Sequence, residues 1–197
     1  MDGSDNAPQI STSMSKSEAV ARMVAPAPGG DFDAIFGAEF GYVMRTLRFL
    51  GVPVSDLEDL THDVFLHVFR HIAEYDPARP ARPWLFVFAL RTARDFRVRA
   101  RHRYLSSDEL PEVSDQRSLP DAILMRSQAQ ALALRALETL SEEERAVFVA
   151  LELDELSAPE LSERLEVPLN TVYSRLRRAR ENFANAARRL ALQESYR

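Results

Sequence analysis

The chain has 197 residues, enough for one or two domains of ordinary size, and 46% of them are hydrophobic, enough to build a core. Its formal net charge is −5, so bulk charge alone does not indicate a nucleic-acid-binding protein. The lack of cysteine excludes disulfides and thiolate chemistry. No apolar run approaches the roughly 20 residues of a membrane span, and residues 1–20 lack the charged-then-apolar order of a signal peptide.

The charges are strongly segregated along the chain. Between Arg91 and Arg103, six arginines accompany one acidic residue, whereas between Glu138 and Glu166 ten acidic residues accompany two arginines. Four more arginines fall within residues 175–180. Such segregation creates local electric fields that the net charge hides.

The distribution of glycine points to an all-α fold. All six glycines lie at or before Gly51, so most of the chain lacks the residue used most in tight hairpins. No stretch alternates apolar and polar residues as a half-buried strand does. Residues 1–30 are rich in Ser, Ala, Pro and Gly without periodicity, which predicts a disordered tail. We therefore expect two small helical domains joined by a flexible acidic linker.

Three helices are expected in the first half of the chain, over residues 31–50, 57–73 and 83–103. Apolar residues recur at helical spacing along the first two. Three prolines between the second and third predict a loop, and the last of them, Pro83, suits the first turn of a helix. The side expected to be buried in the third helix comprises Leu85, Phe88, Thr92 and Phe96.

The second half begins with residues 105–119, which are polar, acidic and marked by proline and so predict a linker. A helix is expected over residues 120–140. Ser141–Glu144 and Ser157–Glu160 both fit the capping box, with Ser at the N-cap and Glu three residues later. Residues 157–183 then predict a helix-turn-helix, with its turn at Val167–Pro168 and its second helix capped by Asn170.

The last helix has two distinct faces. Val172, Leu176, Ala179 and Phe183 follow the spacing of a buried stripe. A second face carries polar and cationic side chains: Thr171, Ser174, Arg175 and Arg178. One side is therefore suited to packing and the other to donating hydrogen bonds.

These segments together resemble the extracytoplasmic-function (ECF) sigma factors, group 4 of the sigma-70 family, which are two-domain promoter-specificity subunits of bacterial RNA polymerase. The stretch "DLEDLTHDVFLHVFRHIAEYDPARPARPWLF" resembles their region 2, and "ALETLSEEERAVFVALELDELSAPELSERLEVPLNTVYSRLRRAR" resembles their region 4. The resemblance implies a region 2 domain over residues 31–104, a linker over 105–119 and a region 4 domain over 120–197.

Region 4 of this family lays its last long helix in the major groove of the promoter −35 element. Arginine there can pair bidentately with guanine, which gives roughly 1–3 kcal/mol of discrimination, and polar residues at the helix start suit phosphate contacts. The residues that the resemblance implies for −35 binding are Asn170, Thr171, Ser174, Arg175, Arg177 and Arg178. Glu166 and Asn170 stand where the family often has glycine, so the base preference of a relative does not transfer.

Region 2 of this family has a surface that docks on the clamp helices of the polymerase β′ subunit. The residues implied for it are Asp56, Glu58, Asp59, His62 and Asp63. Acidic side chains there can pair with arginines of the partner. His62 stands where glutamine is common and introduces sensitivity to pH.

A second surface of region 2 melts and binds the −10 element, holding an unstacked base in a pocket while cations follow the single strand. The residues implied for it are Arg79, Arg82, Arg91, Arg94, Arg97 and Arg101. Trp84 could serve there as a stacking platform, but its neighbours Leu85 and Phe88 favour a place in the core.

The implied partners are core RNA polymerase, through the β′ clamp helices and the β flap, promoter DNA and an anti-sigma factor. The resemblance implies no cofactor, metal or catalytic site, no direct membrane insertion, and a cytoplasmic location. In the linker, four acidic residues either mimic RNA phosphates in the polymerase channel or belong to an inert tether. They are Asp108, Glu109, Glu112 and Asp115.

Other classes of function explain less of the sequence. His67 and His71 have the spacing of a zinc-binding pair, but the glutamate of a His-Glu-x-x-His motif and an obvious third ligand are missing. A stand-alone helix-turn-helix regulator, binding symmetric DNA as a dimer, explains residues 157–183 but not the arginine-rich third helix. A pure protein-interaction module leaves both basic helices unexplained.

Overall fold

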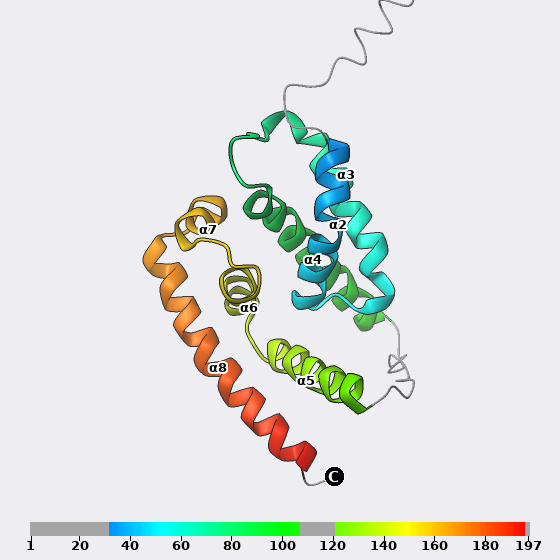
Figure 1. The fold of residues 1–197 in the computed structure, drawn as a ribbon, viewed down its shortest axis with the longest axis vertical. Helices are drawn as coiled ribbons and strands as arrows, with labels where there is room; N and C mark the ends of the chain where they lie inside the picture. Colours follow the sequence, from blue (N-terminus) through cyan, green and yellow to red (C-terminus); the bar gives the residue numbers. More distant parts are fainter. Residues whose placement is uncertain (1–31, 107–120, 196–197) are drawn as a thin grey trace, which may run out of the picture.

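The computed structural model describes residues 32–106 and 121–195, and every regular element in those two ranges is helical (Figure 1). The α-helices are α2 (Phe32–Phe49), α3 (Leu57–Arg70), α4 (Ala81–Ser106), α5 (Asp121–Glu138), α6 (Glu142–Phe148), α7 (Ala158–Leu165) and α8 (Leu169–Ser195). Short 3-10 turns, η1 (Val54–Asp56) and η2 (Ile72–Glu74), flank α3, and a π-helical turn, η3 (Val149–Leu153), continues α6. The all-α prediction is confirmed.

Helices α2, α3 and α4 pack against one another in the first half. The apolar stripe predicted for α2 is buried at its C-terminal end through Val43 and Leu47, while its N-terminal phenylalanines form an aromatic cluster with α3. In that cluster the ring of Phe36 lies 4.8 Å from the ring of Phe65, edge to face. Phe69, whose spacing on α3 also fits the predicted apolar stripe, is instead 59% exposed, with its ring edge-to-face against Phe32.

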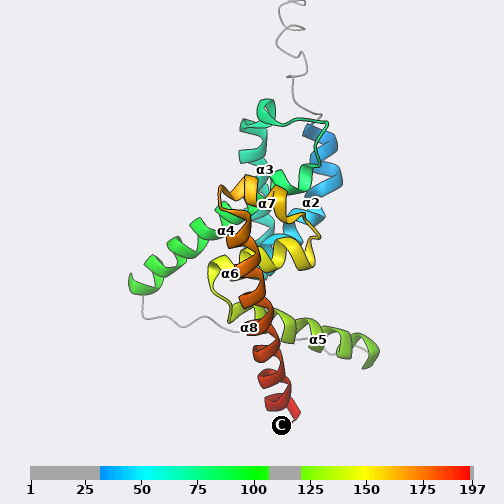
Figure 2. The same cartoon turned by 90° about the vertical axis from the view of Figure 1, so that its left-hand side faces the viewer.

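Helix α4 lies at the centre of the molecule, between α2 and α3 on one side and α6 and α7 on the other (Figures 1 and 2). A helix covered on several sides must be apolar on several sides. Its first half accordingly buries Phe86, Ala89 and Leu90 in addition to the predicted side. Trp84 is 5% exposed and stacks on Tyr75, with ring centroids 4.9 Å apart. The prediction that Trp84 belongs to the core is confirmed.

Helices α5, α6 and α7 all pack on α8 in the second half. Val172, Leu176 and Ala179 of the predicted α8 stripe are buried, and Phe183 is partly buried and stacks on Phe148 of α6 at 4.7 Å. At the start of α6 both capping-box hydrogen bonds are present between Ser141 and Glu144. At the start of α7 the Ser157 hydroxyl accepts from the Glu160 amide and donates to the Glu160 carboxylate at 2.6 Å. Both predicted helix starts are therefore confirmed.

The turn between α7 and α8 differs from the prediction at one residue. Helix α8 begins at Leu169, so Asn170 lies in its first turn and not at its cap. The cause is Pro168, whose carbonyl accepts from the amides of Thr171 and Val172 and so starts the helix earlier. Glu166 ends α7 in the left-handed region, with φ of 55°. Glycine adopts this conformation most easily, which explains why the family often has glycine at this position.

The two halves of the described chain share one hydrophobic core. A single cluster of buried side chains contains Val43 and Leu90 from the first half and Val147 and Val172 from the second. Helix α4 continues to Ser106, so residues 105–106 of the expected linker are helical. The remaining linker residues, with the acids at 108, 109, 112 and 115, and the N-terminal residues 1–31 lie outside the described residues.

Candidate nucleic-acid and polymerase interfaces

The polar face of α8 is directed away from the core along the whole predicted motif. Asn170, Arg177 and Arg178 are exposed, and Thr171, Ser174 and Arg175 are half-buried. Val172, Leu176 and Ala179 bury the opposite side of the same turns, because residues three and four apart share a face of a helix. The structure therefore brings together the six residues predicted for −35 binding.

The arginines of α8 divide by their ion pairs. Arg177 pairs with Glu181 one turn later at 3.3 Å, and Arg180 pairs with Glu152 of η3 with its Nε 3.0 Å from the carboxylate. Among the described residues, neither Arg175 nor Arg178 has a hydrogen bond or ion pair. The donors of these two guanidinium groups are therefore unoccupied within the part of the chain that the structure describes.

The acidic residues predicted for polymerase binding lie on η1 and the first two turns of α3. Glu58, Asp59 and His62 are exposed, and Asp56 and Asp63 are half-buried. Nδ1 of His62 lies 2.9 Å from the Glu58 carbonyl oxygen. Farther along the same helix, Leu66 is 54% exposed and Phe69 is 59% exposed. The acidic residues are therefore followed on α3 by apolar side chains that are more than half exposed, a feature that the sequence prediction missed.

Two arginines of the loop before α4 and its first turn are engaged with acidic residues. Arg79 forms two hydrogen bonds, of 3.0 and 3.2 Å, with the carboxylate of Glu163 on α7. This contact raises the pKa of Arg79 and lowers the pKa of Glu163. Arg82 binds Glu39 of α2 at 2.9 Å and lies over the ring of Tyr42.

The arginines farther along α4 fall into two groups. Arg94 and Arg97 both pair with Glu142 at the start of α6, and the Arg97 pair measures 3.9 Å. Burial lowers the pKa of Arg97, and the charge of Glu142 opposes this shift. Arg91 and Arg101 are exposed. The six predicted −10 residues thus lie along α4 and the loop before it, but three of them are paired with acids of α6 or α7 and a fourth with Glu39 of α2.

A buried polar cluster joins α2 to the end of η3, and sequence reasoning missed it. The Thr46 hydroxyl donates to Oδ2 of Asp154 at 2.8 Å, and both residues are buried. Oδ1 of Asp154 has no hydrogen-bond partner among the described residues. Burial raises the pKa of Asp154, while the hydroxyls of Thr46 and Tyr42 and the charges of Arg45 and Arg82 oppose the shift. Burial beside Asp154 also raises the pKa of Tyr42.

Arg145 of α6 makes a second buried polar contact between the halves. Its Nε donates to the Leu137 carbonyl at 2.8 Å, and its Nη1 donates to the Leu50 carbonyl at 3.3 Å. Burial lowers its pKa. The contact requires glycine at position 51, because a Cβ there would lie 2.3 Å from Nη1 of Arg145. An arginine inside a run of acids was the only sequence signal for this residue.

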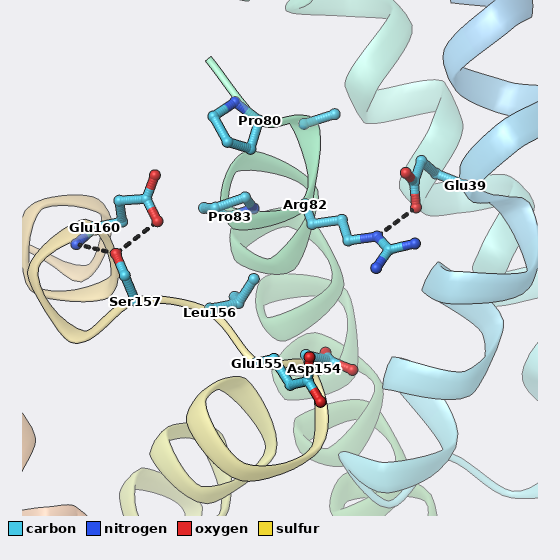
Figure 3. Close-up of a pocket in the computed structure, with 10 residues that line it drawn as sticks. Glu39, Pro80, Arg82, Pro83, Asp154, Glu155, Leu156, Ser157 and Glu160 are labelled. Atoms are coloured by element: carbon cyan, nitrogen blue, oxygen red, sulfur yellow. Dashed lines mark hydrogen bonds and ion pairs between the residues drawn. The ribbon is translucent and has the colours of Figure 1, made fainter.

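A cleft of about 480 Å³ opens between the start of α4 and the segment that joins η3 to α7 (Figure 3). The Arg82–Glu39 pair lies on one side and Ser157 with Glu160 on the other, as Figure 3 shows. Within residues 32–106 and 121–195, no three His, Cys, Asp or Glu side chains are grouped to hold a metal ion. None of the helices described is long and apolar enough to cross a membrane.

Comparison with known families identifies both halves. The model for Sigma-70 region 2 matches residues 39–103, and the model for Sigma-70, region 4 matches residues 130–183. The two matches together cover more than half of the chain, in the order expected from the sequence. A helix-turn-helix regulator without region 2 does not account for the first match, so that alternative is not favoured.

Individual relatives agree with these matches. The ECF RNA polymerase sigma-E factor of Escherichia coli K12 is 28% identical over 147 residues, which cover 68% of this chain and 75% of the relative. RNA polymerase sigma factor NccH of Alcaligenes xylosoxydans xylosoxydans is 27% identical over 173 residues, which cover 86% of this chain and 93% of the relative.

Solved structures of sigma factors share the fold. The sigma factor RpoE of Bartonella quintana, solved in complex with the anti-sigma factor NepR, aligns with a TM-score of 0.61 and 17% identity over 80% of this chain and 97% of that one. CnrH, solved with the cytosolic domain of CnrY, aligns with a TM-score of 0.56 and 22% identity over 83% and 88%. With both regions matched in order, the chain belongs to the sigma-70 family and is an extracytoplasmic-function RNA polymerase sigma factor.

Proposed function

We propose that this sigma factor binds the −35 element with the polar face of α8, the −10 element with the arginines of α4 and its preceding loop, and core polymerase with the acidic face of α3. It has no catalytic site of its own and acts in the cytoplasm. The observation that carries the proposal is the division of the α8 arginines. Arg175 and Arg178 lack ion pairs among the described residues, whereas Arg177 and Arg180 are paired with acids.

The −35 contact follows from the geometry of α8. A helix held by a buried stripe presents its opposite face at a fixed angle to a groove, and the first turns supply amide and hydroxyl donors for phosphates. Arg175 and Arg178 are one turn apart on that face and have the donor pattern that pairs with guanine. Arg177, engaged by an exposed carboxylate, serves the DNA backbone, since an exposed ion pair contributes only about 0–1 kcal/mol and is easily exchanged.

The α3 face has the composition of a protein-binding surface. Its acidic residues favour a basic partner through electrostatic complementarity. Leu66 and Phe69, both more than half exposed, supply the apolar anchor that charged residues alone lack. We assign this face, with Asp56, Glu58, Asp59, His62 and Asp63, to the β′ clamp helices of core polymerase. Region 4 is left to contact the β flap.

An anti-sigma factor is the further partner that we propose. RpoE of Bartonella quintana and CnrH were both solved with proteins bound to them, NepR and CnrY. The shared fold supports an equivalent partner for this chain.

Transcription in vitro on a library of random promoter sequences tests the proposal. With core polymerase, wild-type protein is expected to select transcripts that share a two-part upstream motif. Arg175→Ala should weaken selection at one base of the upstream element by about 5- to 150-fold, equivalent to roughly 1–3 kcal/mol, and leave the downstream element unchanged. Arg188→Ala, an exposed arginine farther along α8, serves as the control and should change neither.

Two results would contradict the assignment. If Arg175→Ala changed base selection at the downstream element, α8 would not be the helix that binds the −35 element. A protein that supports no polymerase-dependent transcript but shifts symmetric duplex DNA alone would behave as a dimeric regulator.

A further inference from the structure

The cleft of Figure 3 opens at the boundary between the two halves of the described chain, and its lining is acidic. Arg82 is the single cation of the lining, against four carboxylates: Glu39, Asp154, Glu155 and Glu160. The Nε of Arg82 is already held by Glu39 at 2.9 Å. The other three carboxylates have no ion pair within residues 32–106 and 121–195. A cleft with this charge attracts cations and repels phosphates.

Asp154 is the residue of the lining whose hydrogen bonding is incomplete. It is 7% exposed, and the Thr46 hydroxyl donates to its Oδ2 at 2.8 Å. Its Oδ1 has no hydrogen-bond partner among the described residues, and the nearby Tyr42 hydroxyl donates to the Arg82 carbonyl at 3.5 Å. Because a buried acceptor without a donor is costly, a ligand that brings a donor to Asp154 gains more here than at an exposed carboxylate.

The rest of the lining distinguishes between kinds of cation. Figure 3 shows Pro83 and Leu156 between Glu160 on one side and Asp154 with Glu155 on the other, so apolar surface separates the acidic groups. In the part of the chain that the structure describes, no three carboxylate or histidine side chains are grouped to hold a metal ion. The cleft volume of about 480 Å³ lies within the usual range for small-molecule sites. These features favour an organic cation with an alkyl chain over a bare ion.

We propose that this cleft is a binding site for a linear alkyl diamine or polyamine. One ammonium group donates to Asp154 and Glu155, the methylene chain lies on Pro83 and Leu156, and the second ammonium group reaches Glu160. The Arg82–Glu39 pair stays in place. The assignment does not depend on the DNA and polymerase contacts proposed above.

Isothermal titration calorimetry on the full chain, with putrescine as the probe, tests the site. Putrescine carries two ammonium groups on a short alkyl chain. Mg²⁺ has the same charge as a bare ion, and 1,4-butanediol has the same chain without the charge. We expect saturable binding of one putrescine per chain and no saturable binding of either comparator.

Three single substitutions locate the binding. Asp154→Asn keeps an acceptor for the Thr46 hydroxyl and should weaken putrescine binding about 10- to 150-fold, the range expected for one lost hydrogen bond to a charged group. Glu155→Gln removes an exposed carboxylate of the cleft and should weaken binding about 2- to 5-fold. Glu143→Gln removes an exposed carboxylate of α6 that does not line the cleft, and it should leave the affinity unchanged.

The proposal is overturned if putrescine shows no saturable binding, or if both cleft variants bind it as tightly as wild type. Equal binding of Mg²⁺ would also overturn it, because general attraction between charges would then explain the result. Circular dichroism reports whether Asp154→Asn keeps the helical fold. If it does not, Glu155→Gln decides alone, and it must weaken putrescine binding more than Glu143→Gln does.

Discussion

At the scale of single residues, Asp154 is an ionisable side chain that the fold buries, although its position in the sequence does not predict burial. The left-handed Glu155, with φ of 55°, follows it, and the Asp154 amide closes the π-helical turn on the Val149 carbonyl at 2.9 Å. This corner directs the carboxylate to Thr46 of α2, 108 residues earlier in the chain. Asp154 is thus the one buried side chain among the ten acidic residues between Glu138 and Glu166.

The pH dependence of stability should carry the signature of Asp154. Its pKa in the folded protein lies above the ordinary value of 3.8 because of burial. Between the two values the folded state binds more protons than the unfolded state, so the stabilisation is fully present below pH 3.8 and is lost as the pH rises through the folded pKa. Urea unfolding of wild type and Asp154→Asn from acid to neutral pH measures this. The free energy of unfolding of wild type, relative to the variant, should fall with rising pH, and a flat or rising difference would contradict the assignment.

At the scale of elements, the short α7–α8 turn sets the position of the −35 face. Glu166 ends α7 in a left-handed conformation, and Pro168 starts α8. The Ser162 hydroxyl donates to the Val167 carbonyl at 2.7 Å and fixes the turn from the α7 side. The angle between the two helices therefore follows from local hydrogen bonds, and a non-glycine residue at the left-handed position carries conformational strain.

Glu166→Gly should stabilise the protein by about 0.5–1 kcal/mol, because glycine adopts a positive φ without steric cost. Arg189→Gly, at an exposed position inside α8, is the matched control and should destabilise by about 1 kcal/mol, since glycine is unfavourable within a helix. The midpoints of urea unfolding distinguish the two. Destabilisation by both substitutions to the same extent would show that the turn is not strained.

At the scale of the whole molecule, the charges that were segregated in the sequence meet. The arginine-rich α4 lies beside α6 and α7, which carry much of the acidic run (Figure 1). The acidic residues of α6 and α7 therefore act locally, because they form ion pairs with arginines of the first half of the chain. Among the described residues, Thr46, Asp154 and Arg145 are buried polar residues that make hydrogen bonds across the boundary.

Thr46→Val tests the boundary through a change of one hydroxyl. The substitution leaves the Asp154 carboxylate buried without the Thr46 hydroxyl as a donor, and such a loss costs about 1–3 kcal/mol. Thr61→Val is the matched control, because Thr61 is also buried but its hydroxyl donates only to the Leu57 carbonyl one turn earlier in α3. We expect a lower urea midpoint for Thr46→Val alone. Equal shifts in the two variants would mean that the contact between the halves contributes no specific stability.

Much of this protein could be predicted without a structure, because the signals are local. The apolar spacing of α2, α3 and α8 identified their buried faces, and the Ser-x-x-Glu pattern identified the starts of α6 and α7. Apolar periodicity and helix capping depend on residues within one or two helical turns of each other, so both can be predicted directly from the sequence. The same locality placed Arg175 and Arg178 on one face of α8.

Other features depend on contacts between distant residues and required the tertiary structure. Helix α4 is buried on several sides because other helices cover it, which no single periodic pattern reveals. Phe69 remained exposed although its spacing suited the core. The sequence by itself determined the helices, most of the buried faces of α2, α3 and α8, and the family of the chain. Only the tertiary structure decided which charges are paired or buried, because an ion pair such as Arg79–Glu163 joins residues 84 positions apart and depends on how the halves pack.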